Sequence, residues 1–121
     1  MPRILYVDDE DDIREVAQMS LELDPELEVK TCSNGPSALE LVKSWSPDLV
    51  MLDVMMPAMD GPETLAHLRS DAVTAEVPVV FITARTQERD VTWLKSLGAV
   101  GVIAKPFEPM GLAELVRTYL P

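Results

Sequence analysis

The sequence predicts an α/β fold in which helices cover both faces of a five-stranded parallel sheet. Five short apolar runs alternate along the chain with five amphipathic segments. Most of the apolar runs are nearly continuous, which is typical of strands whose two faces are both covered. Five repeats of strand and helix, joined by right-handed crossovers, make a doubly wound (βα)5 sandwich.

The predicted elements follow one another in regular order. The strands are expected at 4–7, 27–32, 49–52, 77–82 and 100–104. The helices are expected at roughly 11–23, 36–44, 62–69, 87–97 and 109–120. Proline lies in the first turn of three of these helices, at Pro36, Pro62 and Pro109, and Gly98 follows the fourth. Proline and glycine are favoured at these helix ends, so they support the boundaries.

Apolar residues three or four positions apart give each predicted helix one inward face. The expected inward residues are Ile13, Val16, Ala17 and Leu21; Ala38, Leu39, Leu41 and Val42; Leu65 and Leu68; Val91, Leu94 and Leu97; and Leu112, Leu115, Val116 and Tyr119.

Length and composition limit the classes of protein. The 121 residues fit one domain, 1–121, and a content of 47% hydrophobic and 26% charged residues is that of a globular chain. The formal net charge of −11 argues against direct nucleic acid binding, which needs basic surface. No apolar run approaches the ~20 residues of a membrane span. With the single cysteine, Cys32, and no signal peptide at the start, we expect a cytoplasmic protein.

Polar residues follow four of the predicted strands. Asp8-Asp9 follows the first, Asp53 the third, Thr83 the fourth and Lys105-Pro106 the fifth. The carboxyl ends of parallel strands meet at one edge, where ligands bind at the reversal of strand order. In the order 2-1-3-4-5, Asp8, Asp9 and Asp53 share one crevice, with Thr83 and Lys105 on its far side.

Three carboxylates in one crevice repel one another, so either one takes up a proton or a divalent cation neutralises the group. The cation is favoured, because the sequence offers no apolar pocket to keep a carboxylic acid neutral. An all-oxygen ligand set suits Mg²⁺, which completes its shell with water and phosphate. A lysine and a hydroxyl beside the ion would stabilise a transferring phosphoryl group, and a carboxylate can act as its nucleophile.

Four segments carry a family resemblance: ILYVDDE, PDLVMLDVMMPAMDG, VVFITA and AKPF. In this order, each closing a strand, they resemble the response-regulator receiver domains of two-component signalling, over essentially the whole chain. The resemblance implies the CheY-like, flavodoxin-like fold. It also implies a phosphoacceptor that is not an enzyme in the usual sense but assists its own phosphorylation and dephosphorylation.

The resemblance assigns roles to single residues. Asp53 is similar to the phosphoacceptor, whose donor is a histidine kinase or a histidine phosphotransfer protein. Asp8 and Asp9 resemble the acidic pair that holds Mg²⁺, and the backbone carbonyl of Met55 would be a further ligand. Thr83 and Lys105 resemble the hydroxyl and the lysine that pair with the phosphoryl group.

Further implications of the resemblance concern the surroundings of the acceptor. The Lys105-Pro106 bond would often be cis, and small Ala84 would leave the phosphoryl group room. Val102 departs from the family, which commonly has a tyrosine or phenylalanine there that rotates inward. The partner or output is therefore open, and the surface of the fourth helix, fifth strand and fifth helix could support a homodimer.

Alternative functions remain. The chain could be a receiver excised from a longer regulator or hybrid kinase. An aspartyl-phosphate phosphatase would need a second aspartate two residues after the nucleophile, where this chain has Met55. A flavin carrier would need a loop rich in serine, threonine and glycine after the first strand, where Asp8-Asp9 would repel the flavin phosphate.

Some polar residues are interpreted as structural. Glu10, Asp11 and Asp12 are expected to form the acidic start of a helix. Asp60-Gly61 is interpreted as a turn, His67 as solvated and Cys32 as a small packed residue.

Overall fold

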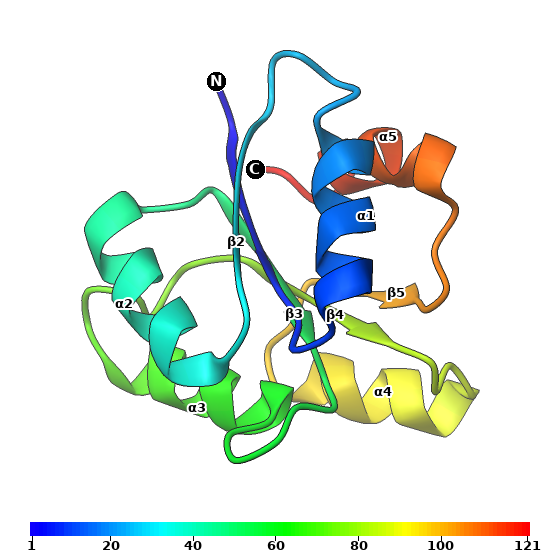
Figure 1. Ribbon diagram of the computed structural model, residues 1–121. Helices are drawn as coiled ribbons and strands as arrows, with labels where there is room; N and C mark the ends of the chain where they lie inside the picture. Colours follow the sequence, from blue (N-terminus) through cyan, green and yellow to red (C-terminus); the bar gives the residue numbers. More distant parts are fainter.

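The computed structural model describes residues 1–121 and contains one five-stranded parallel sheet in the order β2-β1-β3-β4-β5 (Figure 1). The strands are β1 (Arg3–Val7), β2 (Glu28–Cys32), β3 (Leu49–Asp53), β4 (Val79–Thr83) and β5 (Gly101–Ala104). The predicted strand order is confirmed. β4 begins two residues later than predicted, because the Val77 N–H donates to Thr74 in a turn and Pro78 has no N–H to donate.

The helices are α1 (Asp11–Leu21), α2 (Gly35–Trp45), α3 (Gly61–Ser70), α4 (Glu88–Ser96) and α5 (Leu112–Arg117), with a 3-10 turn at Pro109–Gly111. α1 and α5 pack on one face of the sheet, and α2, α3 and α4 pack on the other (Figure 1). None of these helices combines the length and the apolar character that crossing a bilayer requires.

Alternate residues of β1 belong to two separate apolar cores. Ile4 and Tyr6 lie in the core under α1 and α5, whereas Leu5 and Val7 lie in the core under α2, α3 and α4. This double burial explains why the central strands are nearly continuous apolar runs. β2 is only half-buried along its length, because it is an edge strand with one neighbour.

Three residues predicted to face inward are exposed: Val16, Leu97 and Leu115. In α1 the buried positions are Ala17, Ser20 and Leu21, and Val16 lies about 100° round the helix from Ala17. Leu97 lies beyond the last residue of α4. The fifth helix is shorter than predicted, because its first turn is the 3-10 turn and it ends at Arg117.

The start of α3 lies against the end of β3. Asp60, interpreted from sequence within a turn, is the N-cap of α3, and its carboxylate accepts the Glu63 N–H at 2.9 Å. The Gly61 N–H donates to the Val54 carbonyl at 2.9 Å. A Cβ on Gly61 would lie 2.4 Å from the backbone oxygen of Asp53, so only glycine allows this close approach. The loop that leaves Asp53 is therefore held at both ends.

Replacing Gly61 by alanine should destabilise the fold, because the added methyl group meets rigid backbone. We expect a loss of about 1–3 kcal/mol in the free energy of unfolding, measured by urea denaturation. Gly111→Ala is the matched control, since its Cβ would have its nearest neighbour at 3.7 Å, on the flexible side chain of Glu108. Equal urea midpoints for the two variants would contradict this prediction.

Candidate functional site

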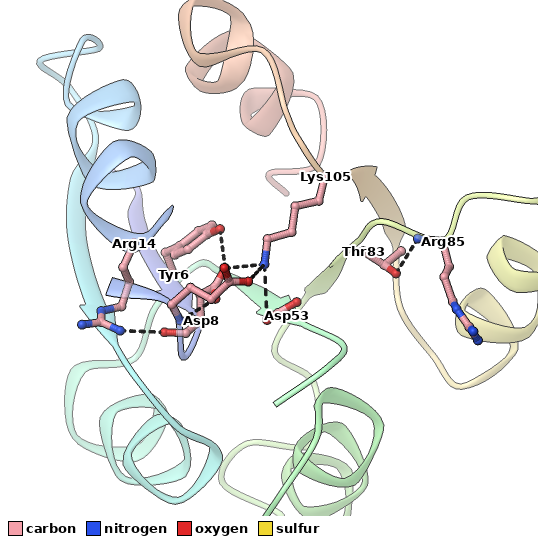
Figure 2. A network of polar contacts seen from close by, with 8 residues as sticks. Tyr6, Asp8, Arg14, Asp53, Thr83, Arg85 and Lys105 are labelled. Atoms are coloured by element: carbon pink, nitrogen blue, oxygen red, sulfur yellow. Dashed lines mark hydrogen bonds and ion pairs between the residues drawn. The ribbon is translucent and has the colours of Figure 1, made fainter. Parts of the chain in front are cut away.

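The polar residues predicted from the sequence lie at the carboxyl edge of the sheet. Asp8 follows β1, Asp53 ends β3, Thr83 ends β4 and Lys105 follows β5. Because β1 and β3 are hydrogen-bonded neighbours, the first and third strands deliver their aspartates side by side. Figure 2 shows Asp8, Asp53 and Lys105 pointing toward one another, with Thr83 further along the edge.

Three carboxylates form one cluster. Asp8, Asp9 and Asp53 each offer an oxygen, and these oxygens lie within 4.8 Å of one another. Asp8 is 0% exposed and Asp53 is 3% exposed, whereas Asp9 is open to solvent. The donor set suits a hard divalent cation that keeps several waters, because all three donors are oxygen and one side of the cluster faces solvent. The cluster could therefore bind such a metal ion.

Lys105 reaches across the crevice to these carboxylates. Its Nζ lies 3.0 Å from Asp8 Oδ2 and 3.5 Å from Asp53 Oδ2. Burial alone would lower the pKa of Lys105, but the hydrogen bond to Asp8 and the charge of Asp53 outweigh it and raise the pKa. The sequence placed Lys105 on the far side with Thr83. That is correct for its main chain only, because opposite charge draws the long side chain across the edge.

Glu10 is the N-cap of α1, as the interpretation as an acidic helix start expects, but it also takes part in the site. Its carboxylate accepts a hydrogen bond from Lys105 Nζ at 3.2 Å, and its side chain makes no capping bond to α1. Asp11 and Asp12 do lie in the first turn of α1 as expected. A run of five acidic residues does not reveal which of them faces a lysine 95 positions away.

Tyr6 was also missed from the sequence. Its buried hydroxyl donates to Asp8 Oδ2 at 3.1 Å (Figure 2). The signal was available, because residues two apart on a strand share a face and a buried tyrosine needs a partner for its hydroxyl. Burial, the nearby charge of Asp8 and the hydrogen bond to it raise the pKa of Tyr6 well above its usual range, so the phenol stays protonated.

Asp8 is held on every side. Its Oδ1 accepts the Glu10 N–H at 3.0 Å, and its Oδ2 accepts from Tyr6 and Lys105. Arg14 Nη1 donates to the Asp8 carbonyl at 2.9 Å. These bonds compensate the loss of water around a buried charge and fix the plane of the carboxylate.

The pKa of the Asp53 carboxyl is perturbed by its surroundings. Burial, followed by the like charge of Asp8, raises the pKa of Asp53 to about 6, although Lys105 opposes the rise. Repulsion can therefore be relieved in the two ways expected from sequence, depending on pH. Below about pH 6 the carboxyl holds a proton, and at neutral pH it is a charged ligand open to a cation.

Thr83 and its neighbours complete the edge. The buried Thr83 hydroxyl accepts the Arg85 N–H at 3.0 Å. The Met55 side chain is exposed in the loop after β3. The Lys105-Pro106 peptide bond is cis, as the family resemblance implied. Val102, in β5, is half-buried against the core under α2, α3 and α4.

Two residues interpreted as structural behave as expected. His67 is exposed on α3. Cys32 is half-buried at the end of β2, packs against the core under α2, and burial raises the pKa of its thiol to about 11. The Cys32 thiol therefore stays protonated at neutral pH.

In metal-free buffer, Asp53 should make the fold less stable as pH rises from about 4 to about 6. The folded carboxyl keeps its proton up to about pH 6, whereas the unfolded one loses it near 3.8. Between these values the folded state binds more protons, so raising the pH favours unfolding. The unfolding free energy of the parent protein minus that of Asp53→Asn, measured with urea in EDTA, should fall across this range.

Asp71 provides the control. The hydrogen bond from Lys43 lowers the pKa of Asp71. The stabilising contribution of Asp71 is therefore lost only as the pH falls below the ordinary aspartate pKa of 3.8. The difference in unfolding free energy between the parent protein and Asp71→Asn should stay nearly constant between pH 4 and 6. A profile for Asp53→Asn as flat as this control would contradict the raised pKa.

Comparison with known proteins identifies the family. The family described as "Response regulator receiver domain" matches residues 4–117. Response regulator Rre1 of Synechocystis sp. is 38% identical over 97% of this chain and 51% of its own length. A protein-glutamate methylesterase/protein-glutamine glutaminase of Halalkalibacterium halodurans is 41% identical over 98% of this chain and 34% of its own length. The chain thus spans about half or less of these curated relatives.

Solved structures agree with the sequence comparison. The chemotaxis response regulator CheY4 of Vibrio cholerae superimposes with a TM-score of 0.89 at 31% identity, over 99% of both chains. A putative response regulator from Chloroflexus aurantiacus gives a TM-score of 0.87 at 29% identity, over 98% of both chains. The fold, the edge cluster and these similarities lead to one conclusion: the chain belongs to the response regulator receiver domains of two-component signal transduction.

Proposed function

We propose that Asp53 accepts a phosphoryl group from a histidine kinase or a histidine phosphotransfer protein, in a reaction that needs Mg²⁺. Residues 1–121 would act as one receiver domain that switches a partner or output. The observation that carries the proposal is the cluster of Asp8, Asp9 and Asp53 beside a single lysine, at the edge where parallel sheets bind ligands.

The transfer is a substitution at phosphorus. An Asp53 carboxylate oxygen forms a bond to phosphorus while the bond from phosphorus to the phosphohistidine nitrogen breaks. The electron pair of that bond stays on the imidazole, which then takes a proton. At neutral pH Asp53 is the charged form that can attack, because its pKa of about 6 lies below that pH.

The proposal gives each neighbour a separate task. Asp8, Asp9, Asp53 and the Met55 carbonyl would hold Mg²⁺, which when bound offsets negative charge on the phosphoryl oxygens. Lys105 would leave Asp8 and pair with the phosphoryl group. The Thr83 hydroxyl accepts from Arg85, so its own proton is free to donate to a phosphoryl oxygen.

The same residues would assist the later loss of the phosphoryl group to water. The proposal includes a cytoplasmic location. It does not include output through the inward rotation of an aromatic side chain, because Val102 stands where the family commonly has tyrosine or phenylalanine. A homodimer through α4, β5 and α5 stays a prediction, supported by the exposed apolar residues Trp93 of α4 and Leu115 of α5.

The acceptor can be tested directly. Incubation with acetyl phosphate and Mg²⁺ should give one phosphoryl adduct that hydroxylamine removes, detected by mass spectrometry of the intact protein. Asp53→Asn should abolish it, because an amide oxygen is a poor nucleophile. Asp60→Asn is the matched control in the same segment, since asparagine also caps a helix. An adduct on Asp53→Asn as strong as on the parent would refute the assignment.

Mg²⁺ should stabilise the folded protein, because it neutralises carboxylates that exist as a cluster only in the folded state. At ~100 times its dissociation constant the gain is roughly 2.7 kcal/mol, seen as a higher melting temperature. Asp9→Asn should melt higher than the parent in EDTA, because it relieves repulsion, and should respond less to Mg²⁺. Asp12→Asn, outside the cluster, should keep the full response. A parent protein whose melting temperature ignores Mg²⁺ would argue against the metal site.

A further inference from the structure

Tyr6 contacts Asp8 and the segment that carries Lys105. Its hydroxyl donates to Asp8 Oδ2 at 3.1 Å (Figure 2). Its ring meets Phe107 edge-on, with centroids 6.4 Å apart and planes at 73°. Phe107 lies two residues after Lys105, in the turn that carries the lysine. One buried side chain of β1 thus packs against the carboxylate and against the segment that presents the lysine.

The donors to Asp8 divide into fixed and movable ones. The Tyr6 hydroxyl on Oδ2 comes from β1, and the Glu10 N–H on Oδ1 is a backbone group just after it, so neither lies on a long flexible side chain. Lys105 Nζ, also on Oδ2, lies on a long side chain that already contacts Asp53. Because Asp8 is 0% exposed, bulk water does not take the place of a donor that leaves. When Lys105 moves, Tyr6 is the remaining side-chain donor to Oδ2.

We propose that Tyr6 is a positioning residue that allows Lys105 to leave Asp8 and pair with a phosphoryl group on Asp53. Its hydroxyl keeps Asp8 Oδ2 hydrogen-bonded while the lysine is away, so the departure does not leave a buried carboxylate oxygen without a donor. This inference rests on the proposed function, and it concerns how the lysine is released rather than how the metal is held.

Tyr6→Phe separates these two tasks, because it removes the hydroxyl and keeps the ring and its contact with Phe107. Without a phosphoryl group, Lys105 still occupies Oδ2, so the affinity for Mg²⁺ alone should change by less than twofold. With beryllium fluoride and saturating Mg²⁺, a phosphoryl mimic on Asp53, the lysine must leave Asp8. We expect about tenfold weaker affinity for beryllium fluoride, equivalent to about 1.4 kcal/mol, by isothermal titration calorimetry.

The chain offers a matched control in its only other tyrosine. Tyr119 packs against Gly101, the first residue of β5, at the amino end of the strand and away from the site. Tyr119→Phe should therefore leave the affinities for Mg²⁺ and for beryllium fluoride unchanged. A loss of less than twofold in beryllium fluoride affinity for Tyr6→Phe, or an equal loss for Mg²⁺ alone, would overturn the inference. A parent protein that binds neither probe would instead refute the proposed function.

Discussion

The site depends on one ammonium group placed among buried carboxylates. Asp8 and Asp53 are buried. Two like unit charges about 5 Å apart repel by about 3 kcal/mol at an effective dielectric constant near 20. Lys105 Nζ attracts both, at 3.0 Å and 3.5 Å. One positive charge cannot neutralise three aspartates, so the edge remains short of positive charge. Burial together with that shortage explains the raised pKa of Asp53, and the shortage makes the cluster suitable for a divalent cation.

The parallel sheet makes this arrangement of charge possible. Its four polar residues Asp8, Asp53, Thr83 and Lys105 stand at the carboxyl ends of four strands, where their side chains face a shared crevice. β4 and β3 lie between the lysine strand and β1, so the lysine must extend across the edge to reach Asp8. Lys105 is bound to Asp8 mainly by charge. In the proposed function it can therefore leave Asp8 for a more strongly negative partner.

The hydrogen bonds around Asp8 restrict what can move. Glu10 and Tyr6 hold the two carboxylate oxygens from fixed positions, and Arg14 holds the backbone carbonyl. At the other end of the crevice, the close contact of Gly61 with Asp53 fixes the start of α3. The carboxylates are thus rigidly placed, and Lys105 and Thr83 are the groups whose positions the proposed chemistry would change.

The sequence by itself determined the fold class, the strand order and the residues that meet at the edge. Buried parallel strands have continuous apolar runs, and strand ends share an edge whatever the details of packing, so Asp8, Asp9 and Asp53 could be placed in one crevice from spacing, with Lys105 on its far side. Only the tertiary structure decided which face of α1 is buried, that α5 begins after a 3-10 turn, and that Lys105 and Glu10 reach the carboxylate cluster. Those outcomes depend on side chains from distant segments competing for the same space and the same charge, and the order of residues along the chain does not encode that competition locally.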